Sequence, residues 1–112
     1  MHELSICNSM VGIVRKHAAG RGVRAVHIRI GAMRQIVPDT LVYCWSLITE
    51  NSELDGTELR VERVPAKIRC TGCGHEQVLD ALTMACGACA GRAVDLFEGD
   101  EFLITSLDLA EV

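Results

Sequence analysis

The first twenty residues carry apolar side chains at helical spacing. One stripe recurs every three or four residues between residues 3 and 19, the period of an amphipathic α-helix. Arg15 and Lys16 stand in the last turns, where cations complement the helix dipole, and Gly20 follows as a helix stop. We therefore predict a helix over residues 3–19 whose buried stripe is Leu4, Cys7, Val11, Val14 and Ala18, widened by Ile6, Met10 and Ile13.

The next segments alternate between strand and helix patterns. Val26, Ile28 and Ile30 alternate with polar or small residues, which predicts a half-buried strand ending at Gly31. Pro38 predicts the start of a second helix, because proline's missing N–H is harmless in the first turn. That helix would bury Leu41, Cys44, Trp45 and Ile48.

Alternation returns on both sides of a cysteine-rich segment. In residues 58–64, Leu59 and Val61 point one way and charged residues the other. Residues 102–109 alternate again, with Leu103, Leu107 and Leu109 expected to face inward. The order helix, strand, helix, strand, insert, strand predicts an α+β fold in which two helices pack on a three-stranded sheet. Pro65 marks the boundary, so we expect one domain of residues 1–65 with 100–112 and an inserted domain of residues 66–99.

Composition and charge narrow the classes of function. The chain of 112 residues is 49% apolar with a formal net charge of −4, which suits a small globular protein and disfavours a phosphate backbone as partner. The start lacks the basic region of a secretory signal, and no window approaches the roughly 20 apolar residues of a membrane span. We therefore expect a cytoplasmic protein with no membrane and no nucleic acid as partner.

Four of the six cysteines form two Cys-x-x-Cys pairs. Cys70 with Cys73 and Cys86 with Cys89 are separated by residues 74–85. Two residues between cysteines let both thiolates reach one ion, and two such pairs supply the closed tetrahedral set of structural zinc. The alternative is a pair of redox-active thiols, but a thioredoxin-like pair should open a helix after a strand, and that pattern is absent. We predict a zinc ribbon whose metal folds the insert and leaves no open position for catalysis.

The other histidines and cysteines are explained without a functional role. His75 could contact the metal site from outside, but an exposed loop histidine is the simpler interpretation. Cys7 and Cys44 fall on apolar helix stripes, which indicates buried small side chains. We expect His17 and His27 to be surface residues.

The amino terminus offers a different set of metal ligands. A free α-amine, deprotonatable backbone amides and the His2 imidazole can surround a metal with nitrogen donors, and such coordination suits Ni(II) or Cu(II). From the residues alone His2 could equally be an exposed histidine with no role.

Several motifs together resemble the HypA/HybF family of hydrogenase nickel-incorporation proteins. They are the opening residues 1–5 (MHELS), residues 29–31 (RIG), the Val-Pro steps at residues 37–38 and 64–65, the two Cys-x-x-Cys pairs and the closing residues 101–107 (EFLITSL). The resemblance runs nearly from end to end. It implies a nickel metallochaperone, not an enzyme, in which His2 anchors a transient Ni(II) with nearby backbone nitrogens and Glu3 assists or contacts a partner. It also implies that Cys70, Cys73, Cys86 and Cys89 hold a structural Zn(II).

The resemblance further implies partners. Such proteins work with a HypB-type GTPase and deliver nickel to the large subunit of [NiFe] hydrogenase, and we expect a monomer or weak homodimer. The sequence departs from many relatives at Met84, where they carry proline before the third cysteine, and at Ala90, where some carry histidine. Two alternatives remain: a zinc-ribbon module that binds protein or nucleic acid, and a thiol redox protein. Residues 66–99 carry three basic and four acidic residues, a net charge of −1, which disfavours nucleic acid.

Overall fold

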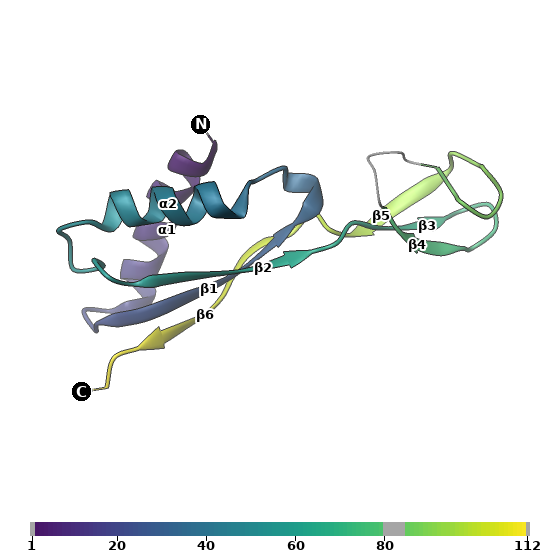
Figure 1. The fold of residues 1–112 in the computed structure, drawn as a ribbon. Coiled ribbons are helices and arrows are strands. Elements are labelled where there is room, and N and C mark those ends of the chain that lie inside the picture. Colours follow the sequence, from purple (N-terminus) through teal and green to yellow (C-terminus); the bar gives the residue numbers. More distant parts are fainter. Residues whose placement is uncertain (1, 80–84, 112) are drawn as a thin grey trace. The chain divides into compact units, whose positions relative to one another are not determined.

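The computed structural model describes residues 2–79 and 85–111, with His2 described only by its backbone. Contacts divide the chain into two compact units. The first, here the helical unit, comprises residues 1–29, 36–62 and 103–112, and the second, here the ribbon unit, comprises residues 30–35 and 63–102. Figure 1 shows the helices and strands of both units.

The helical unit contains two helices and a three-stranded sheet. Helix α1 is His2–Ala18 and α2 is Pro38–Thr49. The sheet has the order β2-β1-β6, in which β1 is Val23–Gly31, β2 is Glu58–Val64 and β6 is Phe102–Leu109. Both helices lie on the same side of this sheet (Figure 1), so the predicted α+β class is confirmed.

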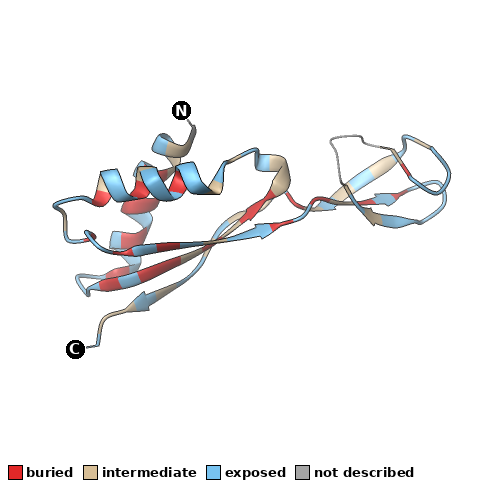
Figure 2. Ribbon diagram, in the orientation of Figure 1, coloured by how far each residue is buried: buried red, intermediate tan, exposed pale blue. Residues whose placement is uncertain are grey.

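The core of the helical unit lies between the helices and the sheet (Figure 2). The inward positions of β1 predicted from alternation, Val26, Ile28 and Ile30, are all buried; the first two lie in this core, whereas Ile30 belongs to the ribbon unit. Trp45 is buried on α2 and its indole N–H donates to the Thr57 carbonyl at 3.0 Å, which ties the helix to the turn before β2. The single tryptophan of the chain therefore lies in this core.

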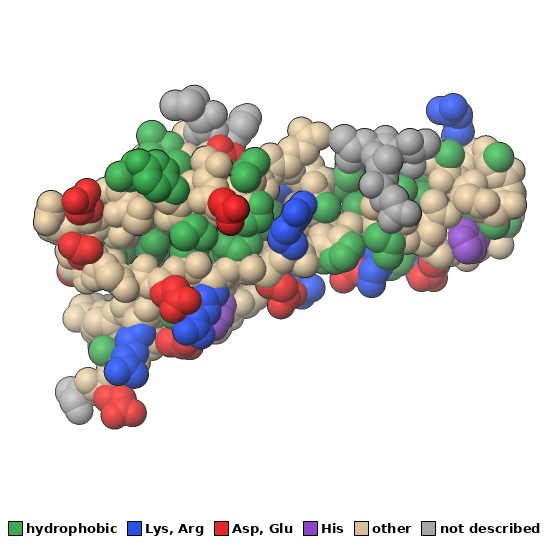
Figure 3. Space-filling model, in the orientation of Figure 1, with side chains coloured by type: hydrophobic (Ala, Val, Ile, Leu, Met, Phe, Trp, Pro, Cys, Tyr) green, Lys and Arg blue, Asp and Glu red, His purple; other side chains and the backbone are tan. Residues whose placement is uncertain are grey.

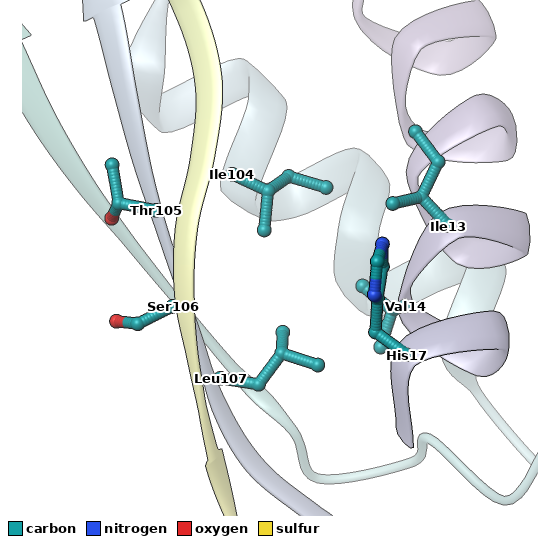
Figure 4. A pocket seen from close by; sticks show the side chains of 7 residues that line it. All are labelled: Ile13, Val14, His17, Ile104, Thr105, Ser106 and Leu107. Atoms are coloured by element: carbon teal, nitrogen blue, oxygen red, sulfur yellow. The ribbon is translucent and has the colours of Figure 1, made fainter. Parts of the chain in front are cut away.

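Several details differ from the expected helix and strand patterns. Leu4, predicted in the buried stripe of α1, is 38% exposed because it lies in the first turn, near the end of the core, and Ile13, predicted to widen that stripe, is 45% exposed. Leu103, predicted to face inward, is 51% exposed, and Ile104 is less exposed. The alternation of β6 breaks further along: Thr105 and Ser106 both point away from α1, whereas Ile104 and Leu107 point towards it (Figure 4). Two neighbours on one face are typical of a β-bulge, which period-two counting cannot anticipate.

The other face of this sheet is polar. His27 lies 2.9 Å from the Asp108 carboxylate, and Arg29 pairs with Glu62 at 2.8 Å. The hydrogen bond with His27 lowers the pKa of Asp108, and the charges of His27 and Arg60 lower it further. A sheet with one apolar and one charged face is a common arrangement for a single layer of helices on strands.

The ribbon unit contains a second three-stranded sheet of order β4-β3-β5 and the 3₁₀ turn η1. Strand β3 is Lys67–Cys70, β4 is Glu76–Val78, β5 is Val94–Glu98, and η1 is Ala32–Arg34. Strand β3 pairs antiparallel with both neighbours. Among its described residues the buried side chains are few, namely Ile30, Val64, Ala66, Ile68, Cys70 and Cys86.

Three backbone segments of the ribbon unit, at Gly31, Ala66 and Gly99, lie very close to one another. A Cβ on Gly31 would lie 2.0 Å from the Gly99 carbonyl oxygen, and one on Gly99 would lie 2.3 Å from the Ala66 Cα. Gly31 N–H donates to the Glu101 carbonyl at 2.7 Å and Met33 N–H to the Gly99 carbonyl at 2.9 Å. Glycine is required here because the backbones are in contact, and Gly99 also has φ of +108°.

Candidate metal centres

The four cysteines predicted to bind zinc lie together in the ribbon unit. Their four sulfur atoms are all within 4.8 Å of one another. The distance from Cys70 Sγ to Cys89 Sγ is 3.7 Å, and from Cys73 Sγ to Cys86 Sγ it is 3.6 Å. Four sulfurs placed tetrahedrally at a Zn–S bond length of about 2.3 Å would be about 3.8 Å apart. The cluster therefore has the dimensions of a tetrahedral four-thiolate metal site.

The two Cys-x-x-Cys turns have the same backbone hydrogen bonds. In the first turn, Gly74 N–H donates to the Cys70 carbonyl at 2.9 Å and Cys70 N–H to the His75 carbonyl at 2.8 Å. In the second, Ala90 N–H donates to the Cys86 carbonyl and Cys86 N–H to the Gly91 carbonyl, both at 2.8 Å. Each turn thus presents its two thiols in the same way.

The residue that follows the second cysteine of each pair has a left-handed backbone conformation. Gly74 has φ of +79° and Ala90 has φ of +59°. Glycine adopts this conformation freely, whereas alanine does so at a cost of roughly 1 kcal/mol or more. The conformation of Ala90 indicates that the second turn is held by its surroundings as well as by its own sequence.

Hydrogen bonds lower the pKa of the first thiol of each Cys-x-x-Cys pair and raise the pKa of the second. The backbone N–H of Cys73 is the largest influence on Cys70 and helps to lower its pKa to about 7. The backbone N–H of Cys89 likewise lowers the pKa of Cys86. For Cys73, the lowering effect of the His75 N–H is outweighed by hydrogen bonds with the Cys86 and Cys70 sulfurs, and the pKa rises to about 12. At neutral pH a cation is therefore needed to ionise all four thiols together.

Gln77 supports the second turn, a role that no motif in the sequence indicates. Its side-chain amide N–H donates to the Ala85 carbonyl at 3.2 Å, and its amide oxygen accepts from Gly87 N–H at 2.7 Å. Gln77 lies on β4, whereas Ala85 and Gly87 flank Cys86. A Cβ on Gly87 would be 3.0 Å from the Gln77 oxygen, which explains the small residue there. Gln77 therefore positions Cys86 through its neighbours.

The predicted nickel residues lie at the start of α1, and the structure describes only part of them. The His2 imidazole lies outside what is described; Glu3 is half-buried in the first turn. Because α1 begins at His2, the amide N–H groups of His2 and Glu3 precede the first intrahelical hydrogen bonds. These amides have no helical carbonyl partner.

Cys7 and Cys44 meet where α1 packs on α2. Cys7 is completely buried, and its thiol donates to the Leu41 carbonyl at 3.5 Å. Burial raises the pKa of Cys7 to about 11, and the charges of Cys44 and Glu3 add to the effect. The predicted burial of Cys7 is confirmed, whereas Cys44 is only half-buried. The sequence did not predict that the two thiols are neighbours.

The remaining histidines do not join a metal cluster in the described chain. His75 and His17 are exposed, while His27 is half-buried beside Asp108. Apart from the four cysteines, no group of three or more potential metal ligands converges within residues 2–79 and 85–111. His17 instead lines a pocket of about 320 Å³ between α1 and β6 (Figure 4). None of the predicted metal residues lines it.

No helix within the described residues has the length and apolar character needed to cross a membrane.

Comparison with known proteins matches the chain over almost its whole length. A family model described as hydrogenase/urease nickel incorporation, metallochaperone, hypA, matches residues 1–109. The chain is 40% identical over 109 residues to the hydrogenase maturation factor HypA of Geotalea uraniireducens, covering 97% of this chain and 99% of the relative. It is 37% identical to the HypA of Geobacter metallireducens, with the same coverage of both chains.

Two solved structures share the fold. The solution structure of the Ni metallochaperone HypA from Helicobacter pylori aligns with a TM-score of 0.65 at 21% identity, covering 96% of each chain. A second, titled solution structure of HypA protein, aligns with a TM-score of 0.69 at 23% identity, covering 98% of this chain and 97% of the other. The full-length family match and the two relatives confirm the resemblance seen in the sequence: the chain belongs to the HypA family of nickel-incorporation metallochaperones for hydrogenase and urease.

Proposed function

We propose that this metallochaperone holds Ni(II) at its amino terminus and transfers it during hydrogenase maturation, while one Zn(II) permanently stabilises the ribbon unit. The observation that carries the proposal is that α1 begins at His2, inside a chain matched from residue 1 by a nickel-incorporation family. The role is transport of an ion, and membership of a metallochaperone family confirms that the chain is not an enzyme.

The proposed nickel ligands are the His2 imidazole and the backbone nitrogens of His2 and Glu3. Nitrogen donors in a tetragonal arrangement suit Ni(II). The first amides of α1 are free of intrahelical hydrogen bonds, so nickel can replace their protons without breaking a helical bond. The Glu3 carboxylate supplies negative charge in the first turn, where it offsets the positive end of the helix dipole that repels a cation. Such a site at a chain end is open to a partner that takes the ion by ligand exchange.

The proposed zinc ligands are Cys70, Cys73, Cys86 and Cys89. Four thiolates at the spacing described above fill a tetrahedral coordination sphere, so the ion has a structural role. We accordingly assign nickel binding to residues 1–65 with 100–112, and zinc binding to residues 66–99. His75, exposed beside the first turn, is outside the ligand set.

The proposed route passes through two protein partners in the cytoplasm. A HypB-type GTPase supplies or gates nickel, and the large subunit of [NiFe] hydrogenase receives it. The chain acts as a monomer or weak homodimer. Family membership supports hydrogenase maturation, and the partner identities are part of the proposal.

A His2→Ala variant tests the nickel site. We expect its nickel affinity to fall by more than the roughly 10- to 100-fold that changes outside the ligand set cause. Zinc should stay at about one ion per chain, since four cysteines bind one structural ion. The measurement is equilibrium dialysis of untagged protein followed by metal analysis. The matched control is His17→Ala, an exposed histidine at the opposite end of α1, which should bind nickel normally.

Adding residues before Met1 gives an independent test of the same site. An extension removes the free amine from the neighbourhood of His2 but leaves every side chain in place, so nickel affinity should fall while zinc content does not change. Unaltered nickel binding in both the extended protein and His2→Ala would exclude the amino-terminal site.

A further inference from the structure

The outward face of α2 is apolar. Val42, Tyr43 and Leu47, here called the α2 ridge, are 40%, 63% and 49% exposed. The opposite side of the same helix is also apolar, with Leu41 and Trp45 buried against the core. A helix that covers a sheet normally presents polar residues to water. Of the twelve residues of α2 only Asp39 is charged, so the exposed face of this helix is more apolar than a face that contacts only water usually is.

Helix α1 provides the contrast. Its exposed positions include Asn8, Ser9, Arg15 and Lys16, which are polar or charged, whereas its exposed large apolar residues, Leu4 and Ile13, are far apart along the helix. In the ribbon unit, exposed Phe97 has the Arg69 guanidinium 5.1 Å from its ring centroid, so a cation covers that aromatic face. The α2 ridge has no such cover among its own helix's charged residues. Among the described residues of the helical unit, it is the helical segment where three large exposed apolar side chains lie within about one and a half turns.

Carboxylates stand at both ends of the ridge. Residues 35–59 contain five acidic residues and no lysine or arginine, against a net charge of −4 for the whole chain. Glu53 pairs with Arg15 and Glu58 with Arg60. Asp39 and Glu50 are exposed and form no ion pair within the described residues. Figure 3 shows hydrophobic side chains gathered over α2 with acidic side chains to either side.

The Asp39 and Glu50 carboxylates and part of the α2 ridge lie along one stripe of the helix. Asp39, Tyr43, Leu47 and Glu50 are separated by three or four residues, so they follow each other along one face of the helix. The stripe is therefore apolar in the middle and negative at each end. A complementary surface is apolar in the middle and carries lysine or arginine at its margin.

The ridge lies next to the amino-terminal part of α1. The Cys7 thiol donates to the carbonyl of Leu41, which directly precedes Val42 on α2. Cys7 is one helical turn from Glu3, and the Glu3 charge affects its pKa. A protein seated on the ridge would therefore have the start of α1 within its reach.

We propose that the α2 ridge docks the GTPase partner of the proposed function, through an apolar patch bordered by basic residues on that GTPase. This inference rests on the proposed function, because it needs nickel at the amino terminus. A second copy of this chain fits less well: a two-fold axis through the ridge would bring Asp39 of one copy towards Glu50 of the other, and both are negative. Tyrosine is enriched among residues that dominate binding energy, which makes Tyr43 the expected centre of the interface.

The test uses the purified HypB-type GTPase of the same organism as probe and full-length, zinc-loaded protein. We expect Tyr43→Ser with Leu47→Ser to weaken association about tenfold or more, as substitutions at an interface centre do. The charge reversals Asp39→Lys and Glu50→Lys should slow association and remove its dependence on salt. The control is Ile13→Ser, a 45% exposed apolar residue on α1, which should associate like the wild type. Circular dichroism and zinc content establish that each variant is folded.

Several outcomes would overturn the inference. They are wild-type affinity in the double variant, no association of the wild-type chain with the GTPase, and loss of a wild-type homodimer in the double variant by sedimentation, which would make the ridge a self-association surface. Nickel dialysis separates this inference from the proposed function. Ridge variants should bind nickel normally, whereas His2→Ala should lose nickel and leave metal-free association with the GTPase intact.

Discussion

Among single residues, Cys70 and Cys7 show how the surroundings of a thiol change its pKa. Cys70 has a pKa of about 7 because backbone N–H groups of its turn, above all that of Cys73, stabilise the thiolate. Cys7 has a pKa of about 11, first because burial disfavours the thiolate and then because Cys44 and Glu3 are near. The sequence separates these two thiols correctly, since one lies in a Cys-x-x-Cys pair and the other on an apolar stripe. It cannot give the proximity of Cys7 to Cys44, which depends on how the two helices pack.

The raised pKa of Cys7 predicts a loss of stability in alkali. In the unfolded chain the thiol ionises near its ordinary pKa of 9.0, whereas the folded chain keeps the proton until about pH 11. Between these values the folded state binds more protons, so the free energy of unfolding falls as pH rises, and below pH 9 this thiol has no effect on the slope. Urea denaturation of zinc-loaded protein at pH 8 and pH 11 measures the fall. Cys7→Ala should show a smaller fall between the two pH values, whatever its stability at pH 8; an equal fall would assign the effect to other groups.

At the scale of helices and strands, Gln77 is a target that only the structure reveals. Its two hydrogen bonds hold Ala85 and Gly87 on either side of Cys86. Loss of a group that orients a metal ligand lowers affinity by about 10- to 100-fold. We therefore expect Gln77→Ala to release zinc to a chelator about tenfold faster or more.

Glu76→Ala is the matched control for Gln77. Glu76 neighbours Gln77 on β4 but pairs with Arg69 on the surface, with half of its side chain exposed. Exposed ion pairs contribute little to stability, so zinc release should stay close to the wild-type rate. Equal rates in the two variants would mean that the Gln77 hydrogen bonds do not restrain the second turn.

The elements themselves were largely predictable from periodicity. The helix expected over residues 3–19 is His2–Ala18, the helix expected at Pro38 begins there, and β6 has the expected limits of Phe102–Leu109. What failed is the side-chain register of β6, where Leu103 is exposed and the alternation breaks at Thr105 and Ser106. The Thr105 hydroxyl donates to the His27 carbonyl, a contact 78 residues apart in sequence. A local pattern cannot contain information about such a contact.

The candidate sites were predictable to different degrees for a similar reason. The spacing of the Cys-x-x-Cys pairs is a local signal, and the structure brings the four sulfurs together as that spacing predicts. The proposed nickel site is also local, because it consists of consecutive residues at the start of α1. The α2 ridge is a different case: periodicity predicted that Leu41 and Trp45 face inward, as they do, but it gave no reason to single out the apolar residues on the opposite side of the helix.

At the scale of the whole molecule, each unit has its own source of stability. The helical unit buries large side chains, among them Trp45, Met10, Ile28 and Leu41. The described part of the ribbon unit buries only Ile30 and Ile68 among its larger side chains, together with smaller ones such as Ala66, Cys70 and Cys86. A core that small rarely folds without a metal or disulfide, and binding of a structural metal then supplies the missing free energy.

This difference predicts that removal of zinc unfolds one unit and spares the other. In Cys73→Ser with Cys89→Ser, or after chelation, amide hydrogen exchange in β3 and β5 should rise towards that of an unfolded chain, because the thiols no longer share a cation. Trp45 is the single tryptophan and lies in the helical unit, so its fluorescence follows that unit alone. Its urea transition should persist at nearly the wild-type midpoint, and nickel binding at the proposed amino-terminal site should persist with it. If the Trp45 transition instead disappears when zinc is removed, the metal supports both units, and the assignment of separate cores to separate roles is wrong.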